Sequence, residues 1–212
     1  MNKNERFVIT INRELGSGGR TVGRKLAEKL GVEFYDKAVV KGLQEKYQLT
    51  VEEIEKLKGR KQGWWAVFKR ELLTPSASST NLFLPRAEEN THLIDTDAVF
   101  KTEKEILNGI AADESCVVAG RSGFYIFRNH PNHLSILIQA SVPFRVERVM
   151  GKQNLTEKEA LDVIKKIDEM RENYVKKYTG VSRYDTRNYD LVISADGKSE
   201  DEIVDLILKY IG

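Results

Sequence analysis

Short apolar runs alternate with amphipathic segments along most of the chain. In the amphipathic segments apolar residues recur every three or four positions, which is the spacing of a helix with one buried face. The strand-like runs are Phe7–Ile11, Glu33–Tyr35, Cys116–Ala119, Leu134–Gln139 and Leu191–Ser194. Alternating strands and helices are typical of a parallel sheet covered by helices on both faces. We therefore predict a three-layer α/β/α fold around a five-stranded parallel sheet.

Three helix starts carry a capping-box pattern, in which a Ser or Thr side chain and a Glu three residues later satisfy each other's backbone N–H groups. The pairs are Thr50 with Glu53, Thr156 with Glu159, and Ser199 with Glu202. These patterns predict helix boundaries and carry no functional meaning.

One region breaks the alternation. Thr74–His92 is polar, rich in Ser and without a clear period, which indicates a flexible excursion. Before it, Gly63–Leu73 has the pattern of a short amphipathic helix that carries Trp64, Trp65 and Phe68. These aromatic side chains either cover an edge of the core or stack on a ligand, and large aromatic residues mostly pack in cores.

Composition excludes few classes of function. The 212 residues include 34 basic and 32 acidic residues, and the net charge of +2 does not indicate a nucleic-acid surface. Cys116 is the single cysteine and lies in an apolar run, which predicts a buried thiol in a reducing compartment. The three His residues lack metal-ligand spacing, so no metal site is expected. No run reaches the roughly 18 apolar residues of a membrane span.

The N-terminus MNKNER lacks the apolar region of a signal peptide. We therefore expect a soluble cytoplasmic protein with neither a nucleic-acid nor a membrane partner. The sequence leaves open whether the chain forms a homodimer.

The stretch INRELGSGGRTVG joins the first predicted strand to a helix that runs from about Thr21 to Leu30. In a phosphate loop, successive backbone N–H groups and a helix N-terminus converge on an anion, and Gly permits the necessary backbone angles. The turn Leu15–Arg20 has this setting, so we predict a phosphate site. The alternative is a plain strand-to-helix turn that needs Gly for tight packing.

The full phosphate-loop pattern GxxxxGK[ST] is not met. Arg13 stands where the first Gly belongs, and Gly19 stands where the Lys belongs. That Lys bridges phosphates as a point charge, so another cation has to replace it if the loop binds a nucleotide. Arg13, Arg20 and Arg24 are near enough in sequence to be candidates.

The opening ITINRELGSGGRTVGRKLAEKLGVEFYDKAVV resembles the cytidylate kinase-like family, relatives of the P-loop nucleoside monophosphate kinases. The likeness continues in order through VVAGRSGFYIF, LSILIQASVPFRVERV, DEMRENYVKKYTG and YDLVISAD. It covers nearly all of the chain outside residues 59–91. GSGG stands in this chain where true cytidylate kinases have GSGKGT.

The resemblance implies an ATP-dependent kinase in which Mg²⁺ is carried mainly by the nucleotide and water. Such enzymes mainly position the reactants and neutralise charge, and Arg20, Arg121 and Arg171 are the catalytic candidates. The residues expected to hold the donor phosphates are Arg13, Gly16, Ser17, Gly18, Gly19, Arg20 and Thr21.

Arg121 follows the predicted strand Cys116–Ala119 and matches the Arg of a DGRD motif that holds the acceptor phosphate in cytidylate kinases. Here the motif is AGRS, so Ala119 and Ser122 replace both acids, and the resemblance does not carry specificity for CMP. Ser122 remains a substrate-binding candidate by position. Asp36 is an acceptor-site candidate, and it is equally suited to cap the following helix.

Arg145 and Arg148 lie three residues apart after the strand Leu134–Gln139, and related kinases often direct such residues at phosphates. Solvated surface arginines are the alternative. Asp168 and Arg171 have the DxxR spacing of the cytidylate kinase lid, where the acid meets the acceptor sugar and the Arg the phosphates. A surface ion pair is the alternative there.

An additional lid Arg has no counterpart in this chain, and Lys165 or Lys166 is the candidate to replace it. Four more residues are possible members of the same cleft, namely Tyr174, Tyr178, Arg183 and Arg187. Two Tyr residues four positions apart are more often packing partners.

Together these features predict one P-loop kinase-like domain over residues 1–212, with an acceptor-binding helical insertion at 42–97 and a lid at 156–187. The expected activity is transfer of the ATP γ-phosphoryl group to a small acceptor, first of all a nucleoside monophosphate such as CMP or dCMP. The alternatives are a nucleotide-binding or phosphate-binding regulatory module with little or no catalysis, because the Lys is absent, and a kinase for another phosphorylated metabolite.

Overall fold

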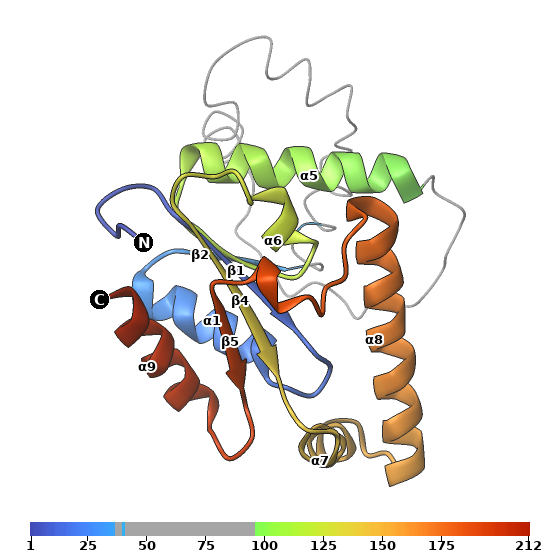
Figure 1. Ribbon diagram of the computed structural model, residues 1–212. Coiled ribbons are helices and arrows are strands. Elements are labelled where there is room, and N and C mark those ends of the chain that lie inside the picture. The colour runs from blue at the N-terminus through green and yellow to red at the C-terminus, as the bar shows by residue number, and fades with distance from the viewer. Residues whose placement is uncertain (37–39, 41–95) are drawn as a thin grey trace, which may run out of the picture. The chain divides into compact units, whose positions relative to one another are not determined.

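A single sheet organises the part of the chain that the computed structural model describes, residues 1–36, 40 and 96–212. Its strands are β1 (Val8–Arg13), β2 (Glu33–Asp36), β3 (Cys116–Ala119), β4 (His133–Gln139) and β5 (Leu191–Ser194). Their order is β2-β3-β1-β4-β5, and β1 pairs in parallel with both β3 and β4, as β4 does with β5 (Figure 1). The predicted five-stranded parallel sheet is confirmed.

The helices follow the alternation of the sequence. They are α1 (Gly19–Leu30), α5 (Thr96–Asp113), α6 (Gly123–Ile126), α7 (Val142–Gln153), α8 (Glu157–Thr179), the 3-10 turn η1 (Thr186–Asn188) and α9 (Glu200–Ile211). The chain divides into two compact units, residues 1–35 with 116–212 and residues 36–115. The second unit contains α5, and the first contains all the other helices named here.

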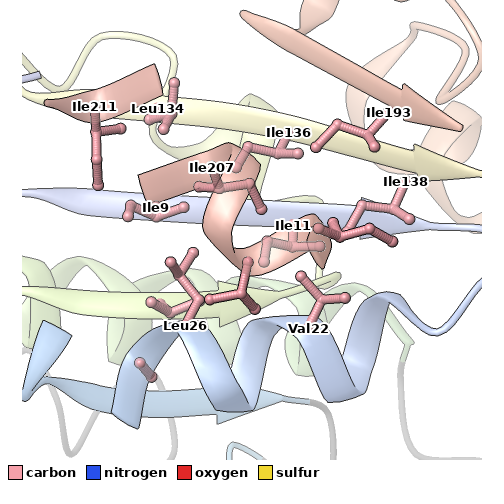
Figure 2. Packing of buried hydrophobic residues seen from close by; sticks show 14 of the residues in the cluster. Ile9, Ile11, Val22, Leu26, Leu134, Ile136, Ile138, Ile193, Ile207 and Ile211 are labelled. Atoms are coloured by element: carbon pink, nitrogen blue, oxygen red, sulfur yellow. The ribbon is translucent and has the colours of Figure 1, made fainter. Parts of the chain in front are cut away.

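Helices α1 and α9 cover one face of the sheet. Ile9 and Ile11 of β1 pack there with Ile136 of β4, Leu26 of α1 and Ile207 of α9, all fully buried (Figure 2). Burying such side chains contributes roughly 1.5–3 kcal/mol each relative to exposure. The β-branched runs of the sequence therefore form this core.

The opposite face of the sheet packs against α6 and α8. Leu137, whose neighbours Ile136 and Ile138 point to the first face, packs instead with Phe124 of α6 and Val175 of α8. Side chains of successive strand residues point to opposite faces, so a strand buried on both sides is apolar throughout. The predicted three layers are confirmed.

The junction between β1 and α1 differs from its predicted boundaries. The strand continues beyond Ile11 to Arg13, because Asn12 and Arg13 pair with Leu137 and Ile138 of β4. Helix α1 begins at Gly19 instead of near Thr21, since Gly18, with φ of +82°, ends the turn and occupies the N-cap position. The turn is thus shorter than the predicted Leu15–Arg20.

Two predicted capping boxes are confirmed, Thr156 with Glu159 at α8 and Ser199 with Glu202 at α9. The thiol of Cys116 is buried, as expected. The pair Thr50 with Glu53, the aromatic segment Gly63–Leu73, the segment Thr74–His92 and nearly all of the insertion predicted at 42–97 lie outside the described residues. Among the helices described, none is long and apolar enough to cross a membrane.

Candidate phosphate-binding site

The loop between β1 and α1 requires glycine at two positions, Gly16 and Gly18. Gly16 and Gly18 have φ of +86° and +82°, in the left-handed region. A Cβ atom added at Gly16 would lie 2.8 Å from the carbonyl oxygen of Arg145. The loop therefore needs glycine for both its backbone angles and its close approach to α7.

The N-terminus of α1 has the properties of an anion site. Gly18 offers no side chain to cap the helix, and the first turn contains no acidic residue but does contain Arg20. The first N–H groups of a helix have no partner within it and carry partial positive charge. A basic residue in this turn opposes the helix dipole, and a bound anion would offset that cost.

A cavity of about 280 Å³ adjoins this helix end. Six basic residues and one acidic residue line it, so its wall is strongly cationic although the whole chain carries only +2. Its glycines and Thr21 come from the predicted donor site. The charged lining residues are Arg13, Glu14, Arg20, Arg24, Arg148, Lys152 and Arg171.

Ser17 is the predicted donor-site residue that does not line this cavity. Its side chain is buried, and its hydroxyl and its backbone N–H both donate to the carbonyl oxygen of Glu14, at 3.0 and 3.3 Å. In this arrangement Ser17 closes the turn internally.

Arg13, the last residue of β1, lines the cavity. A Cβ added at Gly19 would lie 2.5 Å from the Cβ of Arg13 and 3.1 Å from its Cγ. At the other end of the side chain, a Cβ added at Gly120 would overlap Nη1 of Arg13. The side chain of Arg13 therefore extends from the first residue of α1 to the turn that follows β3.

Asp168 connects α8 to the phosphate loop. Its Oδ1 accepts a hydrogen bond from the backbone N–H of Leu15 at 3.0 Å. Its carboxylate also pairs with Arg145, and lies 3.4 Å from Arg171 and 3.5 Å from Arg183. One buried carboxylate thus faces three guanidinium groups beside the loop.

The two arginines of α7 take different positions despite their spacing. Arg145 is buried, pairs with Asp168 and lies 3.8 Å from Glu14, and it does not line the cavity. Arg148 does line the cavity, pairs with Glu200 of α9 and lies close to Gly18.

Arg171 reaches the cavity from α8, as its predicted role requires. Its Nη1 donates to the carbonyl oxygen of Arg13 at 3.3 Å. Burial, and next the charge of Arg183, lower the pKa of Arg171, which still leaves a guanidinium charged near neutral pH. Lys165 and Lys166, the candidates for an additional lid cation, are exposed on α8 and do not line the cavity.

The turn after β3 places Arg121 beside α8. Gly120, Arg121 and Ser122 have φ of +80°, +54° and +54°, a succession that is costly for the two residues with side chains. Arg121 donates to the hydroxyl of Tyr174 at 3.0 Å, and its guanidinium carbon lies 5.1 Å from the centre of that ring. Burial lowers the pKa of Arg121. Ser122 is buried and precedes α6.

The remaining candidates have varied positions. The rings of Tyr174 and Tyr178 pack edge to face with centres 4.9 Å apart, which is the packing role. Arg183 is fully buried and contacts Asn12 and the carbonyl oxygen of Arg13. The side chain of Arg187 is 88% exposed and pairs with Asp185, away from the loop cavity. Asp36 ends β2.

Three further charged residues of the site were not predicted: Lys152 and Glu14 line the cavity, and Glu200 pairs with Arg148. Lys152 follows Arg148 by one helical turn, a spacing that could have identified it. Glu200 reaches Arg148 from α9, and no local pattern signals a contact between residues so far apart in sequence.

Residues 8–196 match the cytidylate kinase-like family over most of the chain. The chain belongs to that family. The predicted family is thereby confirmed.

Cytidylate kinases are among the curated relatives, all at low identity. The chain is 27% identical to the cytidylate kinase of Sulfolobus acidocaldarius over 52% of this chain and 60% of that protein. It is 22% identical to that of Sulfurisphaera tokodaii over 97% of this chain and 95% of that protein. With the enzyme of Saccharolobus islandicus it shares 25% identity over 51% of this chain and 57% of that protein. Two of these three matches therefore span less than two thirds of the relative.

A solved structure is similar over the whole length. The crystal structure of an uncharacterized protein from Eubacterium ventriosum has a TM-score of 0.70 and 25% identity, and the match covers 98% of each chain. It supports the fold and carries no information about an activity.

Proposed function

We propose that this chain is a phosphotransferase that moves the γ-phosphoryl group of ATP to a small acceptor, a nucleoside monophosphate. The observation that carries the proposal is the cationic cavity at the N-terminus of α1. Backbone N–H groups and six basic side chains meet there beside a loop whose backbone requires glycine at Gly16 and Gly18. Such a site suits a triphosphate, whose several negative charges need distributed donors.

In the proposed reaction an oxygen of the acceptor's phosphate forms a bond to the γ-phosphorus. The bond between that phosphorus and the oxygen bridging it to the β-phosphorus breaks, and ADP leaves with the electron pair. The products are ADP and a nucleoside diphosphate. The protein's part is to hold both reactants and neutralise charge on the transferring group.

Different lining residues would contact the donor phosphates and the Mg²⁺ ion. The N–H groups of Gly18, Gly19 and Arg20 would hold the donor phosphates, and Arg148 and Arg171 would face them from α7 and α8. Mg²⁺ on the nucleotide would neutralise part of the phosphate charge. It needs few protein ligands, which suits a cavity whose lining offers the hydroxyl of Thr21 and one carboxylate, Glu14.

Arg121 is proposed to hold the acceptor's phosphate, the role of its match in cytidylate kinases. Its place after β3 supports this, because ligands of parallel α/β sheets bind beyond the carboxyl ends of the strands. CMP or dCMP is the first acceptor to test, given the names of the relatives. The change from DGRD to AGRS, with Ala119 and Ser122 in place of both acids, means that the base need not be cytosine.

The test is Mg²⁺-dependent ADP production from ATP by the purified chain across a panel of nucleoside monophosphates. The Arg121→Ala variant is run in parallel with Arg187→Ala, which removes an exposed guanidinium remote from the loop cavity. We expect one acceptor to stimulate ADP production, Arg121→Ala to lose at least about tenfold of that stimulation, and Arg187→Ala to keep it.

Two results would contradict the proposal in different ways. ATP binding without stimulation by any nucleoside monophosphate would favour the regulatory module, or another phosphorylated acceptor if a wider panel stimulates. Equal stimulation in Arg121→Ala and in the wild type would remove Arg121 from the acceptor site.

A further inference from the structure

We propose that Arg13 replaces the missing P-loop lysine, and that Arg13 and Gly19 have exchanged the roles of the two positions. The phosphate-loop pattern places Gly at position 13 and Lys at position 19, and this chain has the reverse arrangement of a small and a cationic residue. The inference rests on the proposed function, since it names the residue that contacts the donor phosphates.

Arg13 and a side chain at position 19 exclude each other sterically. The Cβ and Cγ atoms of Arg13 lie 2.5 and 3.1 Å from the place where a side chain at position 19 would begin. Cβ atoms do not approach other carbon atoms this closely, so a residue larger than Gly at position 19 cannot coexist with this position of Arg13. The stem of Arg13 thus passes through the space from which the usual lysine extends.

The side chain of Arg13 places its charge beside the turn that follows β3. The guanidinium of Arg13 lies against Gly120, where an added Cβ would overlap Nη1. Gly120 immediately precedes Arg121, the candidate for the acceptor's phosphate. The Arg13 side chain lines the cavity along this path, so its charge lies between the phosphate loop and the turn that carries Arg121.

Hydrogen bonds hold the backbone of Arg13 in place. Its carbonyl oxygen accepts hydrogen bonds from Arg171, at 3.3 Å, and from the buried Arg183. Its N–H donates to Oδ1 of Asn12 at 3.1 Å. A side chain that starts from a strand end held in this way is preorganised for a bidentate phosphate contact.

The other cations near the loop are placed differently. Arg20 and Arg24 are both exposed on α1, and the guanidinium carbon of Arg24 lies 6.0 Å from the centre of the Phe34 ring. The three atoms nearest to a Cβ added at Gly120 all belong to Arg13. The geometry therefore distinguishes Arg13 from the two alternatives that the sequence leaves open.

The first experiment removes the charge and keeps the stem. Arg13→Met retains an unbranched aliphatic chain against Gly19, and Arg187→Met is the matched control at an exposed site. Calorimetry measures the affinity for inorganic triphosphate and for ATP, and the transfer assay measures turnover. We expect Arg13→Met to weaken triphosphate binding by roughly 10- to 100-fold and Arg187→Met to be unchanged. Triphosphate affinity in Arg13→Met equal to that of the wild type overturns the inference.

The second experiment restores the ordinary loop pattern. Gly19→Lys alone should disturb the loop and lower the thermal midpoint, because its Cβ collides with Arg13. Arg13→Gly alone should lose triphosphate binding as Arg13→Met does. The double variant Arg13→Gly/Gly19→Lys should recover both the thermal midpoint and the binding. A double variant that recovers neither, or a stable Gly19→Lys that binds normally, contradicts an exchange of roles.

The binding measurements separate this inference from the proposed function. A wild-type chain without transfer to any acceptor defeats the proposed kinase activity, and the triphosphate affinities still decide the role of Arg13. A wild-type chain with transfer that Arg13→Met fully retains defeats only the role of Arg13.

Discussion

At the level of single residues, Asp168 is central to the site because its carboxylate contacts both the loop and three arginines. It accepts the N–H of Leu15 at 3.0 Å and faces Arg145, Arg171 and Arg183. In the structure its role is therefore to hold α8 and the loop together. The contact with an acceptor sugar, which the family resemblance implies, stays a prediction.

Replacing Asp168 with Asn keeps an oxygen for Leu15 and removes the charge opposite the three guanidinium groups. Breaking a buried ion pair from one side is costly, so we expect Asp168→Asn to lower the free energy of unfolding by about 3 kcal/mol. Urea denaturation measures this. Asp162→Asn, an exposed substitution on the same helix, should change it by less than about 0.5 kcal/mol. Equal effects of the two variants would contradict the role of Asp168.

The sequence predicted which residue types gather at the site better than how they point. Arg145 and Arg148 share a helix face by spacing, yet Arg145 turns inward to Asp168 while Arg148 reaches the cavity. The difference depends on Asp168 and Glu200, which come from α8 and α9 and are distant in sequence. Long-range contacts of this kind leave no local pattern.

At the level of elements, the turn between β1 and α1 depends on glycine at Gly16. A side chain there would be strained at φ of +86° and would meet the carbonyl oxygen of Arg145 at 2.8 Å. We expect Gly16→Ala to lower the free energy of unfolding by more than about 1 kcal/mol and to weaken ATP binding. Both are measurable by denaturation and calorimetry.

Gly151 in α7 provides the matched control for Gly16→Ala. A Cβ added at Gly151 meets nothing within 4 Å, and its φ is not in the left-handed region. Gly151→Ala should therefore stabilise the protein by roughly 0.5–1 kcal/mol. If Gly16→Ala were as well tolerated as Gly151→Ala, the account of the loop would be wrong.

Most helices and strands of the described part could be predicted, because the spacing of apolar residues along the chain follows which side chains are buried. The strands Cys116–Ala119 and Leu191–Ser194 have the predicted limits. The predicted strand Phe7–Ile11 ends too early because Asn12 and Arg13 are polar. In the structure both residues pair with β4 and extend the strand to Arg13. Polar residues at the end of a strand have the composition of a loop, and here they belong to the candidate site.

At the level of the whole molecule, the stability of the fold should depend on pH through His133. His133 is the first residue of β4, and its Nε2 lies 2.8 Å from Oγ1 of Thr10. Burial lowers the pKa of His133 from 6.5 to about 4, while Asp190 acts in the opposite direction and His130 adds to the lowering. In the folded protein the ring is therefore neutral at pH values where the unfolded chain is already protonated.

The sign of the effect follows from proton binding. Between about pH 6.5 and 4 the unfolded chain binds more protons than the folded one, so the free energy of unfolding falls as the pH falls. The total loss is at most about 3 kcal/mol, and His133 adds nothing further below about pH 4. His133→Gln should make the profile flatter over this range. Identical pH profiles for the variant and the wild type would contradict a half-buried histidine that is neutral in the folded protein.

The arrangement of the layers was predictable from alternation and from the family resemblance, and most of the cavity's arginines were predicted from the loop motif and the resemblance, but composition alone gave no sign of the site. A net charge of +2 indicates nothing about binding, yet six basic residues and one acidic residue meet at one cavity. The six basic residues come from β1, α1, α7 and α8 and are assembled only by the fold. Tertiary structure therefore creates the anion site that composition conceals.

The most direct test of the account is to follow the γ-phosphoryl group itself. ATP labelled at the γ-phosphate is incubated with the purified chain, Mg²⁺ and the nucleoside monophosphate that stimulates ADP production best. The account predicts that the label appears in the nucleoside diphosphate, in an amount equal to the ADP formed. Label that stays in ATP, or appears only as inorganic phosphate, would contradict it.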